Sequence, residues 1–293
     1  MTVPVCALSV LIHHSRLALL NVPARFGNTL GARLASDLGE ITWRQARRDS
    51  NEQHGLVKKP SPKSLCYIKR VAVIAWIILM IPPAQVVYVR MTHPTTTVPM
   101  ALRSIKRSLG IAGQARADYI WVPLEHVPTF FLACVLQGED DHFFQHYGFD
   151  WPAIMDAWRR AKATGQPAVG ASTISQQCAR SLFLWSARSW VRKVLEAYYT
   201  AWMEVVLSKR RILELYVNVI ETGDGIYGIQ AAAKHYYGVD ARELSREQAA
   251  MLVAILPNPK KLNPREPSEA LRSRQMNILQ WTEHVKQPID IRK

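Results

Sequence analysis

The chain has 293 residues, of which 48% are hydrophobic and 20% charged, which is ordinary for a protein that folds into one or two domains. Its net charge is +14, yet zinc-finger spacing, an aromatic ribonucleoprotein motif and a dense basic stripe are all missing from the sequence, which excludes nucleic acid as the expected partner. An anionic membrane face or a pyrophosphate substrate explains the charge better.

Residues 1–68 show weak periodicity and mixed polarity, and they include a Lys-Lys-Pro-Ser-Pro-Lys stretch. We expect a cytoplasmic, disordered tail here, apart from a short helix near residues 7–20. A translated upstream region is an alternative for this segment.

Residues 71–89 contain 19 positions without a charge, and as a helix they would extend about 28 Å, close to the hydrocarbon thickness of a bilayer. Lys69 and Arg70 precede this run and Arg90 follows it, which favours a transmembrane helix over residues 69–90 rather than a buried core helix. Pro82 and Pro83 predict a kink or a short span. A cleaved signal peptide fits poorly, because the basic region ahead of the apolar run is too long.

The charges on either side of this span differ. Five basic residues and no acid occur between Gly55 and Arg70, whereas residues 91–102 carry no charge. This bias places the amino terminus in the cytoplasm and the rest of the chain in the periplasm or outside the cell. Residues 91–119 form a juxtamembrane linker, in which the segment 98–111 has the pattern of a basic amphipathic helix. That helix either lies on phospholipid or packs on the domain.

From His126 onwards the periodicity is helical and strand signals are nearly absent, which predicts one mainly α domain over residues 120–293. Thr173 with Gln176, and Ser245 with Gln248, have capping-box spacing. The predicted helices are 128–138, 173–184, 189–207, 210–221, 228–237, 245–256 and 268–284.

The four cysteines show no spacing typical of metal ligands, and we expect no metal cluster formed by the protein. Free buried thiols are the favoured interpretation. A disulfide between Cys134 and Cys178 is left open, because sequence separation does not establish its geometry.

Glu139 opens the acidic motif of residues 139–148 and follows an apolar run, so its carboxyl group is expected where a buried helix ends. Partial burial would raise its pKa, as a general acid or base that works near neutrality requires. A solvated acidic turn is the alternative, and it is favoured for this motif taken alone. Phe143, His146 and Gly148 would shape the turn, with His146 as a structural hydrogen-bonding residue.

Gly170 precedes Ser172 and Thr173, and the helix that follows would direct its free amides toward the loop. Such helix amino termini bind anions readily. On these residues alone, an ordinary helix cap is the favoured reading.

Arg192, Lys193 and Glu196 can face one cleft, because they lie within one turn of a predicted helix. A surface ion pair is the alternative, but the apolar residues Val194, Tyr198, Trp202 and Val205 would fix the helix against a core. Glu196 beside two cations would stay ionised, whereas Glu139 is the carboxyl that burial can tune.

These motifs, in this order, resemble glycosyltransferase family 51, the peptidoglycan glycosyltransferases, and within it the monofunctional biosynthetic members with a single membrane anchor. The likeness covers about residues 120–284. It rests on Glu139-Asp140-x-x-Phe143-x-x-His146-x-Gly148, Gly170-x-Ser172-Thr173-x-x-Gln176-Gln177, Arg192-Lys193-x-x-Glu196, Lys209-x-x-Ile212-Leu213-x-x-Tyr216-x-Asn218 and Gly225-x-Tyr227-Gly228-Ile229-x-Ala231-Ala232.

The resemblance implies a lysozyme-like helical fold, a location in the bacterial inner membrane, and polymerisation of lipid II into β-1,4 glycan strands with inversion. It implies that Glu139 is the general base and that Glu196 assists departure of the lipid pyrophosphate. The substrate contacts that it implies are Ser172, Thr173, Gln176, Gln177, Arg180, Arg192 and Lys193. Its structural positions are Asp140, Phe143, His146, Gly148, Gly170, Lys209, Tyr216 and Asn218.

Some residues depart from the family pattern, since Ala171 replaces a frequent Gly, and Arg180-Ser181 replaces Lys-Asn. Residues 151–167 correspond to the family's mobile segment, which we expect to be poorly ordered or to face lipid. The resemblance implies lipid II, the growing glycan strand and phospholipid as partners, and leaves open other wall-synthesis or division proteins. No cofactor is certain, and a divalent cation, Mg²⁺ or Mn²⁺, at the pyrophosphate is also left open. A lysozyme-like murein hydrolase and a non-catalytic membrane scaffold are the alternative functions.

Overall fold

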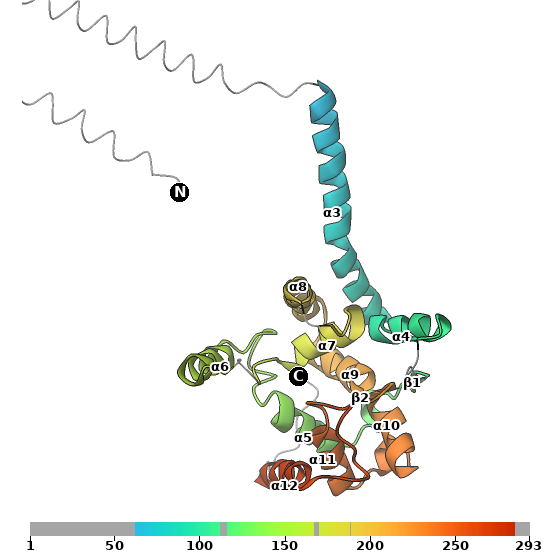
Figure 1. Cartoon of the computed structure of the whole chain (residues 1–293), viewed down its shortest axis with the longest axis vertical. Helices are drawn as coiled ribbons and strands as arrows, with labels where there is room; N and C mark the ends of the chain where they lie inside the picture. The colour runs from blue at the N-terminus through green and yellow to red at the C-terminus, as the bar shows by residue number, and fades with distance from the viewer. Residues whose placement is uncertain (1–61, 112–115, 167–169, 188, 285–293) are drawn as a thin grey trace, which may run out of the picture. The chain divides into compact units, whose positions relative to one another are not determined.

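The computed structural model describes residues 62–111, 116–166, 170–187 and 189–284 (Figure 1). The chain divides into two units, residues 1–72 and 73–293. The predicted short helix near residues 7–20 and the predicted tail up to residue 61 lie outside the described residues. Helix α3 (Pro62–Met91) begins before the predicted span, so residues 62–68 of the predicted tail are helical.

Helix α3 is, by length and composition, able to cross a membrane over Ser64–Met91. It continues through Pro82 and Pro83 without ending. Residues 71–79 are all exposed, whereas Pro82, Val86 and Val89 are buried. The residues of the predicted span therefore form one helix, and its last turns pack against protein.

Every helix predicted beyond residue 126 appears within the described residues, with ends that differ by at most two positions. Ser and Thr N-caps begin several of them, and the predicted capping boxes at Thr173 and Ser245 both form. The helices are α5 (Thr129–Glu139), α7 (Ile174–Phe183), α8 (Trp190–Val206), α9 (Lys209–Val219), α10 (Gly228–Tyr237), α11 (Arg246–Ala254) and α12 (Glu269–His284).

Two further helices lie in segments for which the sequence left alternatives open. Helix α4 (Val98–Ser108) packs on the domain, because Met100 is buried and the buried Arg103 forms ion pairs with Glu221 and Asp224. The expected poorly ordered or lipid-facing segment forms helix α6 (Trp151–Thr164), and its large apolar side chains Trp151, Met155 and Trp158 are exposed.

A small sheet was not predicted. Strands β1 (Asp118–Tyr119), β2 (Glu221–Gly223) and β3 (Ile226–Tyr227) lie in the order β1-β3-β2, with β1 parallel to β3 and β2 antiparallel to it. Each strand has two or three residues, which is too short for an alternating apolar pattern to register in the sequence.

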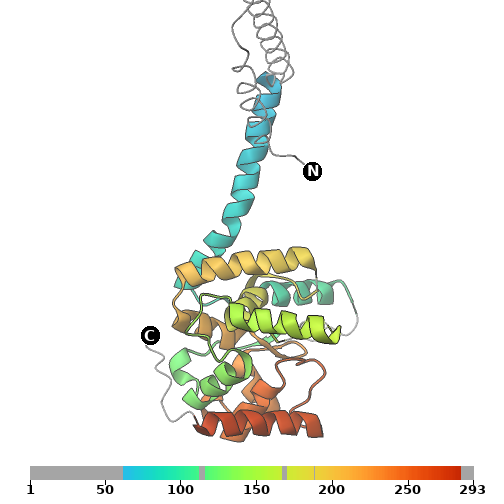
Figure 2. The same cartoon turned by 90° about the vertical axis from the view of Figure 1, so that its left-hand side faces the viewer.

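Helix α9 lies at the centre of the domain, since every side chain from Ile212 to Val219 is buried. Helices α7 and α10 pack on α9, and α8 packs on α7. Helices α5, α11 and α12 form a second packed group. Figures 1 and 2 show α8 beside the domain end of α3, with α12 at the opposite end of the domain. The mainly α prediction is confirmed.

Candidate active site

Glu139 is the last residue of α5, and its side chain is only 11% exposed. The Gln177 Nε2 donates a hydrogen bond of 2.9 Å to its Oε2, and the Arg274 Nη2 lies 3.3 Å from its Oε1. The Tyr216 hydroxyl in turn donates to the Gln177 Oε1 at 3.3 Å. One carboxyl group is thus held by a neutral amide on one side and by a cation on the other.

Burial raises the pKa of Glu139 above its ordinary range. The hydrogen bond from Gln177 and the positive charges of Arg274 and Arg180 oppose this rise. A carboxyl group with a raised pKa is a stronger base when ionised, and the nearby cations keep an ionised form accessible. Glu139 therefore has the properties that a general base needs.

The turn after Glu139 is held from several directions. The Asp140 carboxylate accepts hydrogen bonds from the Ile174 N–H and from the His146 Nε2, each at 2.9 Å. Burial raises the pKa of Asp140, and the hydrogen bonds from His146 and Ile174 oppose that rise. Phe143 is fully buried, and the Lys209 Nζ lies 4.5 Å from its ring centre.

Gly148 ends this turn at a position that only glycine fits. Its φ is +82°, and a Cβ atom there would lie 2.7 Å from the Thr200 Cγ2. Its carbonyl oxygen accepts a hydrogen bond of 2.7 Å from the Thr173 hydroxyl. The acidic turn and the loop before α7 are thereby joined.

The segment 170–177 forms a helix cap, as its spacing predicted. The Thr173 Oγ1 accepts from the Gln176 N–H, and the Gln176 Oε1 accepts from the Thr173 N–H. Both side chains are buried and hold the cap, and their predicted contact with substrate stays a prediction. Ser172 and Gly170, which has a φ of +83°, line a depression of about 230 Å³ that also contains Glu139.

Glu196 is 2% exposed, and both of its oxygens face cations. The Arg192 Nη1 lies 2.5 Å from its Oε2, and the Lys193 Nζ lies 2.5 Å from its Oε1. The Arg192 Nε also donates to the Ala187 carbonyl oxygen at 3.0 Å. The predicted grouping of these three side chains on one side of the helix is confirmed.

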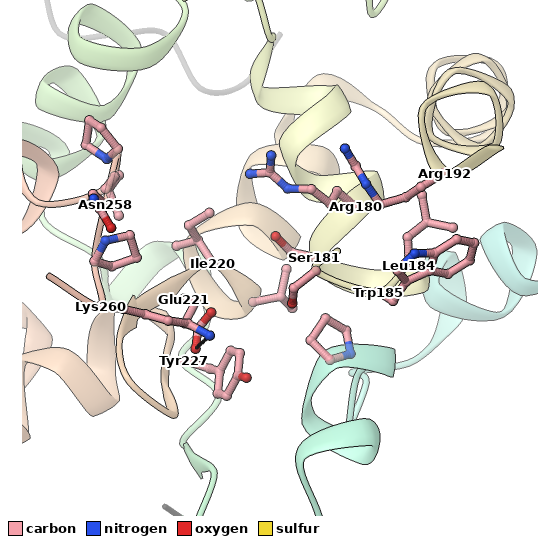
Figure 3. A pocket seen from close by; sticks show the side chains of 16 residues that line it. Arg180, Ser181, Leu184, Trp185, Arg192, Ile220, Glu221, Tyr227, Asn258 and Lys260 are labelled. Carbon is pink, nitrogen blue, oxygen red and sulfur yellow. Dashed lines mark ion pairs between the residues drawn. The ribbon is translucent and has the colours of Figure 1, made fainter. Parts of the chain in front are cut away.

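A cavity of about 270 Å³ lies next to this cluster (Figure 3). Arg180 and Arg192 line it on one side, and an ion pair of 3.2 Å between Lys260 and Glu221 lies across from them. The Arg180 guanidinium has no hydrogen bond or ion pair to any side chain that the structure describes, so it is available to an anion in this cavity. Trp185 and Tyr227 add aromatic walls.

Two of the cavities that the structure describes lie beside the two glutamates. Glu139 lines one depression, and Arg192, the partner of Glu196, lines the other. Helix α7 contributes to both sites. Gln177 contacts Glu139, and Arg180, about one turn later, lines the second cavity. The predicted groove shared by the two glutamates stays a prediction. Residues 167–169 and 188 lie outside the described residues.

The sequence did not single out Arg274, Lys260 or Glu221. Arg274 lies in α12, 135 residues from Glu139 in the chain, and a lone arginine on a helix gives no signal of such a contact. Two predicted structural residues are fully buried: Tyr216, described above, and Asn218. The Asn218 side chain forms three hydrogen bonds, one from the Val122 N–H and two to the Val122 and Glu214 carbonyl oxygens.

Cys134 and Cys178 are buried free thiols, and burial raises the pKa of Cys134 to about 12. Among the described residues, no group of three or more His, Cys, Asp or Glu side chains could hold a metal ion. The oxygens of Glu196 already face two cations, so its surroundings do not fit a divalent cation held by the protein.

Comparison with known proteins gives a consistent result. Residues 107–283 match the transglycosylase family. A biosynthetic peptidoglycan transglycosylase of Xylella fastidiosa (strain M12) is 39% identical over 208 residues, which cover 71% of this chain and 85% of that protein. A protein of the same name from Pseudomonas putida (strain GB-1) is 49% identical over 154 residues, covering 53% of this chain and 65% of the relative.

Proposed function

The chain belongs to the transglycosylase family, and we propose that it polymerises lipid II into glycan strands, with Glu139 and Glu196 in different catalytic roles. Its activity is that of a peptidoglycan glycosyltransferase in cell-wall synthesis, carried on a mainly helical, lysozyme-like domain. The observation that supports the division of roles is the contrast between the two glutamates. Among the described residues, Glu139 forms one ion pair, with the partly exposed Arg274, whereas the buried Glu196 forms two, with Arg192 and Lys193.

Glu139 accepts the proton of the acceptor sugar hydroxyl as that oxygen attacks the anomeric carbon of the donor. The hydrogen bond from Gln177, itself held by Tyr216, fixes one carboxylate oxygen and leaves the carboxyl group facing the depression beside Ser172. A raised pKa matches this role, because a base that works near neutrality should bind the proton firmly once it arrives.

The bond between the anomeric carbon and the pyrophosphate oxygen breaks as the new glycosidic bond forms, and the electron pair leaves with undecaprenyl pyrophosphate. Arg180 and Arg192 line the cavity that would receive this group, and they would stabilise its growing negative charge. Glu196 orients Arg192 and Lys193 through two ion pairs. Attack from the face opposite the pyrophosphate converts its α linkage into a β-1,4 bond.

Because the described acids do not form a metal site, we assign the countercharge to these arginine and lysine side chains and derive no step through Mg²⁺ or Mn²⁺. Helix α3 would serve as a single-pass anchor in the inner membrane, with its basic end in the cytoplasm and the domain in the periplasm. Exposed Trp151 and Trp158 on α6 would contact phospholipid. Contact with other wall-synthesis proteins stays a prediction.

The test is polymerisation of lipid II by the full chain in detergent, comparing Glu139→Gln with the wild-type protein. Loss of the base should lower the rate by a factor of about 10² to 10⁴. Glu125→Gln is the matched control, because Glu125 is exposed and forms an ion pair with Arg210. Polymerisation by Glu139→Gln at the wild-type rate would contradict the assignment.

The same preparations separate the alternatives. A murein hydrolase would release soluble muropeptides from purified sacculi, and it has no need for the cations beside Glu196. A scaffold would bind lipid II without turning it over. We expect polymer from lipid II and no muropeptides.

A further inference from the structure

The domain end of α3 is built into the catalytic domain. Pro82, Val86 and Val89 share one face of the helix at intervals of four and three residues, and all three are buried. Val86 and Val89 belong to the same apolar cluster as the core of the domain. The last turns of the helix are therefore packed on protein, whereas the preceding turns are exposed.

The two prolines explain why this contact can be specific. Proline has no N–H, so Pro83 leaves the Leu79 carbonyl oxygen without its donor in the helix. The Tyr198 hydroxyl of α8 donates to that oxygen at 2.9 Å. In a bilayer, a carbonyl freed by proline needs a partner from a neighbouring element, and Tyr198 supplies it.

Two more contacts fix the same part of α3. The Tyr199 hydroxyl donates to the Gln85 Oε1. The Arg211 Nη2 donates to the Val89 carbonyl oxygen at 2.8 Å and to the Thr92 carbonyl oxygen at 2.6 Å. Val89 lies in the last turn of α3, and Thr92 is the residue that follows the helix. The anchor is thus hydrogen-bonded to α8 and α9 along its last turns.

Helix α8 also carries Glu196, which lies only two and three residues before Tyr198 and Tyr199. Within about two turns, the same helix carries the two tyrosines that contact the anchor and the ion pair between Arg192 and Glu196. A change in the anchor contact would therefore tilt the helix that presents the pyrophosphate-binding side chains.

We propose that Tyr198 and Tyr199 are positioning residues that hold the cavity lined by Arg180 and Arg192 at a fixed height and angle to the membrane anchor, with Tyr198 bonded to the carbonyl that Pro83 frees. This inference rests on the proposed function. The pyrophosphate of a lipid-linked substrate lies at the membrane surface, so a docked domain meets it at a constant depth. A domain joined to its anchor by a loose linker would tilt and miss it.

The experiment uses the full chain in phosphatidylethanolamine and phosphatidylglycerol nanodiscs, comparing wild type with Tyr198→Phe and Tyr199→Phe. Tyr88→Phe is the matched control, because Tyr88 lies on α3 with an exposed ring. Amide hydrogen exchange over residues 85–92 should quicken by about twofold to tenfold in the first two variants, the range set by one hydrogen bond. It should not change in the control.

Activity is measured on two substrates. Polymerisation of long-chain lipid II embedded in the bilayer should fall severalfold in Tyr198→Phe, whereas polymerisation of a short-chain lipid II in detergent should not change. A merely structural role would lower both rates equally, and that result would overturn the inference. Unchanged exchange and unchanged rates in both tyrosine variants would overturn it as well.

Pro83→Ala supplies an independent check. The alanine N–H can bond to the Leu79 carbonyl, so Tyr198→Phe should have a smaller effect on exchange in this background than in the wild type. An undiminished effect would overturn the role of the freed carbonyl. If the wild-type protein polymerised neither substrate, the proposed function would fail, while the exchange measurements would still test the docking.

Discussion

Replacing Arg274 with glutamine tests whether a cation from the last helix sets the protonation of Glu139. Glutamine keeps much of the side-chain length and its hydrogen-bonding capacity but removes the charge that lies 3.3 Å from the Glu139 Oε1. Because the positive charge of Arg274 opposes the rise that burial causes in the pKa of Glu139, its removal should raise that pKa further.

The size of the effect follows from the distance and from exposure. Two unit charges at this separation interact by about 5 kcal/mol at an effective dielectric constant of about 20. The Arg274 side chain is 40% exposed, so solvent and salt reduce this to about 1 kcal/mol. An energy of that size corresponds to a roughly fivefold change in rate where the ionised fraction of Glu139 limits the reaction.

The assay is the pH dependence of kcat/KM for lipid II between about pH 5 and pH 9. A higher pKa leaves less ionised base at low pH, so Arg274→Gln should be slower than wild type on the acid side. The two proteins should converge at high pH, where the base is ionised in both. Arg272→Gln, on the exposed side of α12, is the control.

An equal loss at every pH would show that Arg274 acts on geometry alone and would refute the electrostatic reasoning. An acid limb that moved to lower pH would refute its sign.

Three further outcomes are expected. Asn218→Ala removes three buried hydrogen bonds and leaves the Val122 N–H without a partner, so the free energy of unfolding measured in urea should fall by about 2 to 4 kcal/mol. A fall of less than about 0.5 kcal/mol would contradict this account. Glu139→Gln should raise Tm at neutral pH. Burial raises the pKa of Glu139 in the folded state, so the stability of the wild-type protein falls as the pH rises through that pKa. The gain in Tm should vanish below about pH 4, where the carboxyl group is protonated in both states, and a gain that persists there would argue against burial as the cause. Arg192→Gln should lower the rate of polymerisation by about 10²-fold or more, because it removes a cation from the cavity and leaves Glu196 paired with Lys193. A loss of less than about threefold would show that Arg192 does not bind the pyrophosphate.

Local patterns in the sequence were sufficient for part of this site. Arg192, Lys193 and Glu196 lie within one turn of one helix, so their spacing alone predicts that they meet. The cap formed by Thr173 and Gln176 is local in the same way, although a short motif does not distinguish a side chain that binds substrate from one that supports a loop. The helices were predictable because apolar residues recur in them at helical spacing, between capping residues and turns that mark their ends.

Contacts between distant segments could not be predicted in this way. Arg274 reaches Glu139 because α12 packs against α5, and Tyr216 reaches Gln177 because α9 packs against α7. Such pairings depend on how the helices assemble, which periodicity does not encode. The three short strands were missed for a different reason, since two or three residues carry no measurable alternation.

The arrangement of α7 explains how two buried carboxyl groups can differ in one enzyme. Gln177 and Arg180 lie three residues apart and therefore side by side on this helix. Gln177 contacts Glu139, and Arg180 lines the cavity beside Arg192. Arg180 also opposes the rise in the pKa of Glu139. An anion bound at Arg180 would offset part of that positive charge and make Glu139 a stronger base. Binding of the donor pyrophosphate and activation of the acceptor hydroxyl would then be coupled through a single side chain.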